Sequence, residues 1–114
     1  MITISRVYDQ PTPEIGYRIL VDRLWPRGLS KEGLKLDKWM KDIAPSNELR
    51  KWYSHDPEKW DEFRTRYSEE LDRNPLTPEL LKICRQKDVI FLYSSRVVDI
   101  NNAVALKLYV EKHL

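Results

Sequence analysis

The sequence predicts a single small α/β sandwich of the Rossmann-like kind, with a mainly parallel sheet of about four strands and helices on both faces. Two segments, Tyr17–Val21 with its apolar middle and the wholly apolar Val89–Tyr93, are typical of strands covered on both sides. Residues with helical spacing separate these two segments, and strands separated by helices indicate a parallel sheet. A length of 114 residues corresponds to one domain, so we expect residues 1–114 to fold as one unit.

The first third of the chain is predicted to hold strands and turns. Residues 2–8 alternate between apolar and polar side chains, which predicts a half-buried strand at an edge of the sheet. Pro11 and Pro13 then indicate a loop. After the first buried strand, Trp25–Gly28 predicts a turn, and Ser30–Glu32 opens a short helical turn.

The apolar side chains of residues 36–43 fit the spacing of a helix and also that of a strand. These side chains recur at helical spacing, yet every second residue from Trp39 to Ile43 also fits a strand. Pro45 follows closely and the segment is short, so we favour a strand and keep a helix as the alternative.

From Ser46 onward the chain carries the start signals of four helices. Each signal is a capping side chain, in two cases with a proline just inside the helix, and they are Ser46, Asp56 with Pro57, Thr77 with Pro78, and Asp99 or Asn101. In the second of these helices, large apolar side chains recur every three or four residues from Trp60 to Leu71, which indicates a buried face. The expected order is therefore β-β-(β)-α-α-α-β-α.

Composition excludes several classes of protein. The chain has 20 Lys and Arg against 18 Asp and Glu, so its net charge of +2 excludes a strongly basic nucleic-acid arm or an acidic tail. One cysteine and two histidines argue against a disulfide framework and a multi-His or Cys-based metal centre, and we expect neither metal nor cofactor. No apolar run approaches the ~20 residues that span a bilayer. We expect a soluble, cytoplasmic protein with no membrane partner.

Polar loops follow both apolar strands, at the positions where open α/β sheets bind ligands. The candidate ligand-binding residues in these loops are Arg23, Trp25, Arg27, Ser94, Ser95, Arg96 and Asn101. Arginine presents a planar fork of donors that suits phosphate or carboxylate, and the start of the last helix adds free N–H groups. If the two strands are neighbours, the loops face each other, and the sequence then predicts an anion-binding crevice.

Two residues are candidates for catalysis, Asp22 and His55. Asp22 would act as a base if it were removed from water, although it could instead pair with an arginine or cap a turn. His55 precedes Asp56 and resembles a general-base pair, but adjacent side chains seldom hydrogen-bond and Asp56 is predicted to cap a helix. The simpler alternative is that Arg23 and Arg27 pair with nearby carboxylates at the surface.

Four tryptophans fall within 36 residues of one another: Trp25, Trp39, Trp52 and Trp60. We expect the last three to lie in the core. Trp25 lies between arginines, where an exposed indole would stack on a base or ring, but it would equally serve as an apolar plug beneath its own turn.

Three blocks of the sequence resemble the YeaO-like family, a group of bacterial and archaeal domains of unknown function (DUF488). They are Tyr17–Lys31 with its LVDRLWPRG string, Ile43–Pro57 with APS and HDP, and Phe91–Ala103. The resemblance covers nearly the whole chain and names no activity. It implies a shared site made of Asp22, Arg23, Trp25, Arg27 and His55. The family pattern often has a histidine where this chain has Ile100, so no role of that histidine is carried over.

Three functions fit these patterns. We favour a protein that binds, or acts on, a small phosphorylated or nucleotide-like anion held by arginines at the strand ends. The second is a single-stranded nucleic-acid-binding module built on Trp25 and its flanking arginines. The third is a protein-interaction module, with homodimerisation through the first strand as one form.

Overall fold

The computed structural model describes residues 1–9 and 15–114, and within them it contains a four-stranded sheet in the order β1-β4-β2-β3. The strands are β1 (Ile2–Arg6), β2 (Tyr17–Leu20), β3 (Lys38–Trp39) and β4 (Val89–Tyr93). Each neighbouring pair is parallel, so all carboxyl ends meet at one edge. The parallel sheet and the edge position of the first strand are confirmed, whereas the loop predicted from Pro11 and Pro13 lies outside the described residues.

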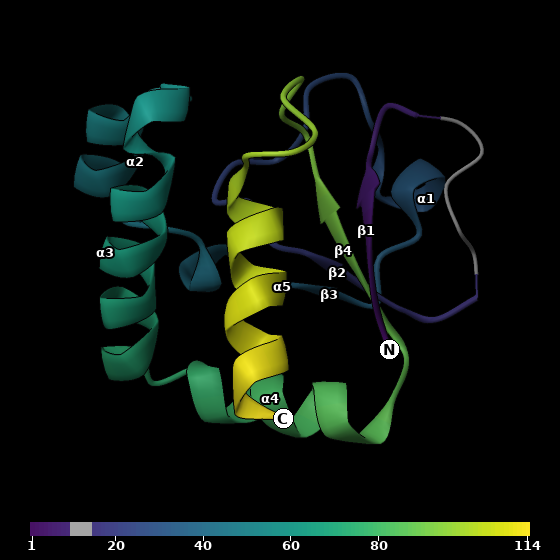
Figure 1. The fold of residues 1–114 in the computed structure, drawn as a ribbon. Helices are drawn as coiled ribbons and strands as arrows, with labels where there is room; N and C mark the ends of the chain where they lie inside the picture. The colour runs from purple at the N-terminus through teal and green to yellow at the C-terminus, as the bar shows by residue number, and fades with distance from the viewer. Residues whose placement is uncertain (10–14) are drawn as a thin grey trace.

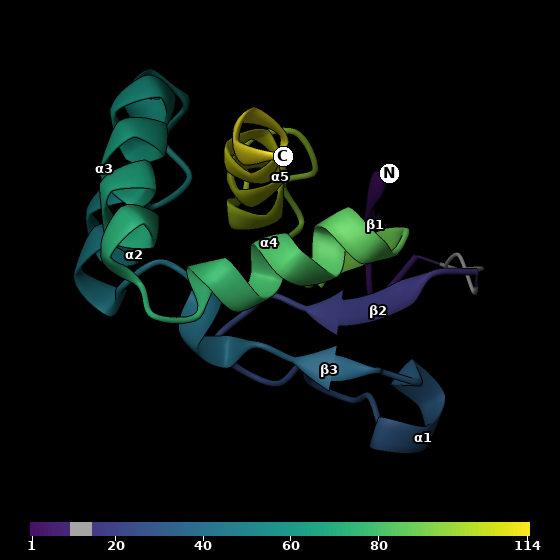
Figure 2. The ribbon, with the colours of Figure 1, turned by 90° about the horizontal axis from the view of Figure 1, so that it is seen from below.

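Helices cover the sheet unequally. The α-helices are α1 (Lys31–Leu34), α2 (Asn47–Tyr53), α3 (Trp60–Arg73), α4 (Thr77–Gln86) and α5 (Asn102–His113). Four of them lie on one face, and the single turn of α1 lies across the sheet from them (Figures 1 and 2). No helix within residues 1–9 and 15–114 has both the length and the apolar character needed to cross a bilayer.

The central strand β4 explains why both faces carry a core. All five of its residues are buried. Because side chains alternate along a strand, Phe91 and Tyr93 pack with the four helices, while Ile90 and Leu92 pack with Leu34 of α1 on the other side. The continuous apolar run in the sequence therefore corresponds to a strand with no solvent-facing side, as predicted.

Three of the predicted caps are present, and the cap predicted at Thr77 is wrong. Thr77 is the first residue of α4, whose N-cap position is Leu76 and makes no side-chain cap hydrogen bond, and the Thr77 hydroxyl donates instead to the Leu71 carbonyl at 2.6 Å. The Ser46 hydroxyl accepts from the Leu49 N–H at 3.1 Å and starts α2, and the Asp56 carboxylate accepts from the Glu58 N–H at 3.0 Å. Asn101, with 0% of its surface exposed, accepts from the Val104 N–H at 3.0 Å and starts α5. Each cap satisfies a helix N–H that has no partner within the helix.

The segment 36–43 divides between two structures. Lys38 and Trp39 form β3, and Lys41–Ile43 then form a short 3₁₀ helix. The expectation of a core position for Trp39 is wrong: β3 is the edge strand, and 38% of Trp39 is exposed. Its indole N–H donates to the Asp22 carbonyl at 2.7 Å, so the ring is fixed to the surface by its polar end.

Trp25 adopts the simpler of its two predicted roles. Its indole N–H donates to the Leu29 carbonyl at 2.7 Å, and its ring packs beneath the turn on the side of the sheet that α1 covers. An edge-to-face contact with Trp39, 5.4 Å between ring centroids, closes the other side. Trp52 and Trp60 pack, partly buried, against the larger core.

Candidate functional site

A pocket of about 220 Å³ lies where β2 and β4 end and α2 begins. Its polar lining comes from four separate parts of the chain and includes Asp22, Arg23, Asn47, Arg50, His55, Ser94, Ser95 and Asn102. The strands β2 and β4 are hydrogen-bonded neighbours, which brings their following loops together. A pocket therefore lies at the carboxyl ends of these strands, where ligands bind in open α/β sheets.

Asp22 ties three elements together at the base of the pocket. One carboxylate oxygen accepts from both the N–H and the hydroxyl of Ser94 at 2.8 Å, and the other accepts from the Asn102 amide at 3.1 Å. The same Asn102 amide donates to the Val21 carbonyl at 3.2 Å. The end of β2, the end of β4 and the first residue of α5 are therefore joined through one carboxylate.

Arg23 holds the segment before α2 against the end of β2. Its guanidinium donates to the carbonyls of Ala44 and Pro45, each at 3.2 Å, and pairs with Asp42 at 3.4 Å. Its Nε is buried and has no hydrogen-bond partner among residues 1–9 and 15–114. Most of this arginine is thus engaged by the protein, so less of its donor capacity is left for a ligand than the sequence suggested.

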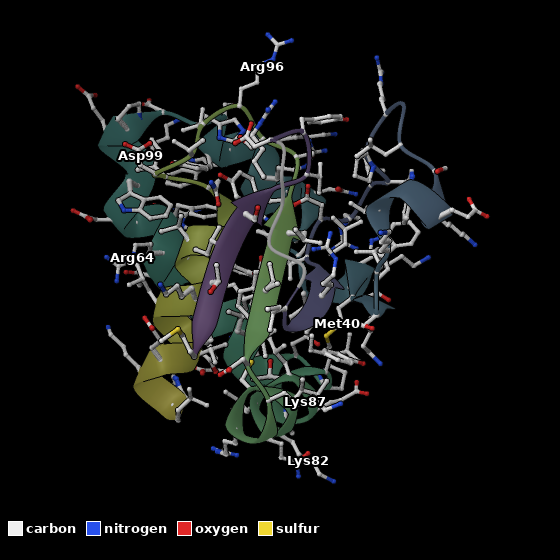
Figure 3. The ribbon with its side chains drawn as sticks, turned by 90° about the vertical axis from the view of Figure 1, so that its right-hand side faces the viewer. Met40, Arg64, Lys82, Lys87, Arg96 and Asp99 are labelled. Carbon is white, nitrogen blue, oxygen red and sulfur yellow. The ribbon has the colours of Figure 1, made fainter. Side chains whose placement is uncertain are left out.

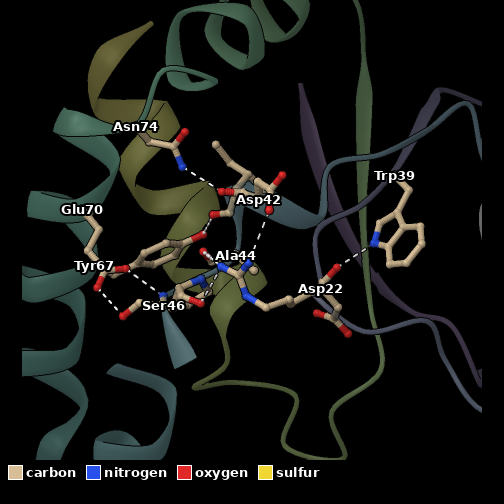
Figure 4. Close-up of polar contacts among 11 residues, drawn as sticks. Asp22, Trp39, Asp42, Ala44, Ser46, Tyr67, Glu70 and Asn74 are labelled. Carbon is tan, nitrogen blue, oxygen red and sulfur yellow. Dashed lines mark hydrogen bonds and ion pairs between the residues drawn. The ribbon is translucent and has the colours of Figure 1, made fainter. Parts of the chain in front are cut away.

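The same segment is held on its other side by α3 (Figure 4). Glu70 accepts from the N–H of Ser46 at 2.9 Å and from its hydroxyl at 2.7 Å, and the Tyr67 hydroxyl donates to the Ile43 carbonyl at 2.6 Å. Asn74 donates to the Asp42 carbonyl at 2.9 Å. The start of α2 is therefore fixed from two directions, and with it the residues that α2 contributes to the pocket.

Helix α2 contributes residues that the sequence reading did not include in the site. Asn47, Arg50 and Tyr53 all line the pocket, and their three-residue spacing places them on one face of the helix. Among the described residues, the side chains of Asn47 and Arg50 have no hydrogen-bond or ion-pair partner. The spacing was visible in the sequence, but nothing local indicated which face of α2 would meet the strand ends.

Four of the predicted ligand-binding residues lie outside the pocket lining. Trp25 is engaged with Leu29, Arg27 is exposed in its turn, and Asn101 uses its side chain to cap α5 and to donate to the Val97 carbonyl at 2.7 Å. Arg96 is exposed and projects away from the body of the molecule (Figure 3). Of the three arginines expected to converge, the structure places only Arg23 at the pocket.

His55 does line the pocket, from the loop after α2. Ser54 and His55 both have left-handed backbone conformations, with φ of 45° and 56°. This turn brings the imidazole to 5.8 Å from the Tyr53 ring, centroid to centroid. The neighbouring Asp56 caps the next helical turn, as predicted, so the imidazole lies beside an aromatic ring.

Tyr53 forms part of the pocket wall as a neutral phenol. Burial, with smaller contributions from Asp99 and Asp56, raises its pKa from 10.0 to about 12. Its hydroxyl donates to the Ile100 carbonyl at 2.7 Å. A phenol with this pKa and this partner is a poor proton acceptor near neutral pH. In the described part of the chain, no group of three or more His, Cys, Asp or Glu side chains is placed to hold a metal ion.

The full length of the chain, residues 1–114, matches a family model described as the inactive DUF488-N3 subclade. The chain belongs to this subclade. It is 42% identical over 106 residues to the uncharacterized protein YeaO of Escherichia coli, which covers 92% of each chain. It is also 42% identical over 105 residues to the uncharacterized protein Rv3073c of Mycobacterium tuberculosis, covering 92% of this chain and 89% of that one. No solved structure matches it.

Membership of the DUF488-N3 subclade confirms the resemblance to YeaO-like proteins that the three sequence blocks indicated. The printed names of the relatives assign them no activity. The description of the subclade as inactive concerns the family as a whole, and the residues of this chain's pocket have to be considered on their own chemistry.

Proposed function

We propose that this protein binds a small anion in the pocket at the ends of β2 and β4, without transforming it. The single observation that supports this most is Arg50, an exposed arginine that lines the pocket and has no hydrogen-bond or ion-pair partner for its side chain among the described residues. It stands on a helix that is itself fixed at its start. A guanidinium is the side chain best suited to a carboxylate or phosphate, because its donors form two parallel hydrogen bonds.

Two further polar side chains of the pocket, Ser95 and Asn47, have hydrogens that no acceptor in the described residues takes up. The Ser95 hydroxyl oxygen accepts from the Val97 N–H at 3.1 Å, which leaves its own hydrogen free to point into the pocket. The Asn47 amide adds two further N–H groups. A pocket whose unused groups mainly donate hydrogen bonds favours a ligand rich in acceptors, such as an anion.

Binding is favoured over catalysis because the candidate base is already in use. Asp22 accepts three hydrogen bonds from Ser94 and Asn102, so both of its carboxylate oxygens are already engaged within the protein. His55 lies next to the Tyr53 ring, and no side chain of the described residues forms a hydrogen bond with its imidazole. The description of the subclade as inactive agrees with this assignment.

The nucleic-acid alternative is not carried forward, because it depended on an exposed Trp25. That indole is half-buried and hydrogen-bonded to Leu29, so its ring offers little free face for stacking.

The proposal is tested by titrating the protein with acetate, benzoate and inorganic phosphate at low ionic strength while following amide chemical shifts by NMR. We expect at least one of these anions to perturb the amides of residues 47–55 and 94–95. Replacing Arg50 with glutamine removes a charge-assisted hydrogen bond, and binding should weaken about tenfold or more.

Arg73→Gln is the matched control, since Arg73 is an exposed arginine at the end of α3, outside the pocket lining. It should leave binding unchanged. Equal weakening by the two variants would reduce the effect to net charge and overturn the proposal, as would an absence of any perturbation at the pocket.

A further inference from the structure

His55 is a polar residue of the pocket lining, and the proposed binding of an anion through Arg50 leaves it without a role. We infer that His55 is the second unpaired cation of this site: its protonated imidazolium binds the anion together with Arg50. The affinity for the anion then rises as the pH falls through the range in which imidazole takes up a proton. This inference rests on the proposed anion-binding function, and it adds to that function a binding residue and a dependence on pH.

Both ring nitrogens of His55 are available to a ligand. Within residues 1–9 and 15–114 neither nitrogen forms a hydrogen bond, and the residue is exposed, so its imidazole can exchange a proton with water. A protonated imidazole carries two N–H donors and no acceptor. His55 therefore offers a ligand the same kind of group as Arg50 does, a positive charge with N–H donors, which is the group that binds anions most strongly.

The turn after α2 sets the position of this imidazole. Ser54 and His55 both have left-handed backbone conformations, with φ of 45° and 56°. A residue with a Cβ adopts this conformation at a cost, and such strain is retained mainly where the surrounding structure imposes it, often at binding sites. In this protein the turn ends α2 and leaves His55 in the lining of the same pocket as Arg50.

Protonation of His55 doubles the formal charge of the pocket lining. The lining contains two arginines and one aspartate, so its formal charge is +1 with a neutral imidazole and +2 with a protonated one. One of the arginines, Arg23, already pairs with Asp42 and donates to two carbonyls. At about 220 Å³ the pocket is smaller than the ~300–1,000 Å³ of sites for drug-sized ligands, so a small anion inside it lies near both Arg50 and His55.

The other charged groups around His55 are carboxylates and guanidiniums. They come from the end of β2, from α2 and from the loops beside Tyr53, and they are Asp22, Arg23, Arg50, Asp56 and Asp99. The last two of these carboxylates lie near enough to Tyr53 to raise the pKa of its phenol. The helices α3 and α5 contribute the uncharged Phe63 and Asn102 to the lining. Imidazole is the side chain that ordinarily changes its charge between about pH 5 and pH 8, so a change of anion affinity in this range points to a histidine.

The chain contains one other histidine, His113, which provides an internal control. It stacks on Tyr109 with ring centroids 4.1 Å apart, near the end of α5, and this end of the helix lies on the side of the molecule away from the carboxyl ends of the strands (Figure 1). An α-amino group also titrates near this range, but that of Met1 pairs with Asp88 just before the parallel strands β1 and β4 begin, away from the pocket.

The test measures the dissociation constants of sulfate and acetate at about pH 8 and about pH 6 from the amide chemical shifts of residues 47–55 and 94–95, with the full chain at low, matched ionic strength. Both probes keep their charge over this interval, whereas phosphate takes up a proton. We expect the affinity to be about threefold or more higher at the lower pH, because a nearby unit charge attracts the anion through water that screens it only in part. By reciprocity, saturating sulfate should move the midpoint of the His55 ring-proton titration to higher pH and leave that of His113 unchanged.

Three variants identify the titrating group. His55→Asn removes the imidazole but keeps a residue that tolerates the left-handed backbone, so it should show the weaker affinity of about pH 8 at both pH values. His113→Asn is the matched control and should keep the full pH dependence. His55→Lys carries its charge at both pH values, and Lys35 of this chain already has a left-handed backbone with φ of 53°. This variant should bind at about pH 8 as tightly as the unaltered protein binds at about pH 6, and the amide spectrum of each variant reports whether it remains folded.

The outcomes separate this inference from the function on which it rests. If a probe perturbs the pocket amides with equal affinity at both pH values, or if the pH dependence persists in His55→Asn, His55 is not the second cation and anion binding stands. Loss of the pH dependence in His113→Asn overturns the inference in the same way. If sulfate and acetate leave the pocket amides unchanged at both pH values, the inference is overturned, and the proposed function fails with it when benzoate and phosphate also leave them unchanged.

Discussion

Asp22 lies in the pocket lining, and its carboxylate is engaged by other parts of the chain. Its position after a buried strand marked it as a candidate base. In the structure its two carboxylate oxygens accept from Ser94 and Asn102, which belong to elements more than 70 positions further along the chain. The carboxylate therefore links the ends of β2 and β4 and the start of α5 by hydrogen bonds, within the pocket lining.

Replacing Asp22 with asparagine should therefore cost stability. Asparagine keeps one acceptor oxygen and places an NH₂ group against donors that the second oxygen had satisfied. We expect the free energy of unfolding to fall by about 1–3 kcal/mol, measured by urea denaturation. Asp9→Asn is the control, because within the described part of the chain the Asp9 carboxylate makes one exposed pair, with Arg6 at 3.3 Å, and its replacement should cost at most about 1 kcal/mol. Equal losses of unfolding free energy in the two variants would contradict a structural role for the Asp22 carboxylate.

At the level of elements, the start of α2 determines the geometry of the pocket. This helix has seven residues, too few to be stable alone, so its position depends on its neighbours. Glu70 of α3 accepts two hydrogen bonds from Ser46, and Arg23 holds the carbonyls just before it. Because Asn47 and Arg50 follow within one turn, any shift of this start moves the donors that the proposed ligand requires.

Glu70→Ala should loosen this start. The Ser46 N–H then loses its acceptor, and we expect a loss of about 1–2 kcal/mol in urea denaturation. Anion binding at the pocket should weaken as well, although Glu70 is not in the pocket lining. Glu69→Ala, one position earlier on an exposed part of α3, is the matched control and should change neither quantity. Unchanged binding in a destabilised Glu70→Ala protein would show that α2 does not depend on this contact.

On the scale of the whole molecule, buried tyrosines make the free energy of unfolding depend on pH in the alkaline range. Burial raises the pKa of Tyr53 and of Tyr109 from 10.0 to about 12, and the Tyr109 hydroxyl also donates to Asp72 at 2.7 Å. A phenol with a raised pKa in the folded protein stabilises it fully below the unfolded value of 10.0. This contribution is lost as the pH rises from there through about 12.

The urea midpoint should therefore fall between pH 9.5 and pH 11.5. Lysines also lose their charge in this interval, so the decisive comparison is with a Tyr109→Phe variant, in which the fall should be shallower. A slope identical in both proteins would mean that this phenol does not contribute to the alkaline transition.

The sequence predicts where the pocket lies in the fold, but it predicts only some of the residues that line it. The two apolar strands and the polar residues after them placed Asp22, Arg23, Ser94 and Ser95 correctly at one edge of the sheet. Arg27 and Arg96 were included because of their residue type, but loop conformation leaves both exposed. The orientation of a loop side chain depends on contacts that are distant in sequence, and a local pattern does not contain them.

The sequence by itself determined the strands, the helix starts and the parallel sheet, because periodicity, capping side chains and prolines act over a few neighbouring residues. Tertiary structure alone decided that Asn47, Arg50 and Tyr53 of α2 line a pocket with the residues that follow β2 and β4, and that Phe63 and His55 line it as well. These groups come together only when α3 holds α2 against the sheet. The physical reason is that the hydrogen bonds holding α2, such as Ser46 to Glu70, join residues 24 positions apart.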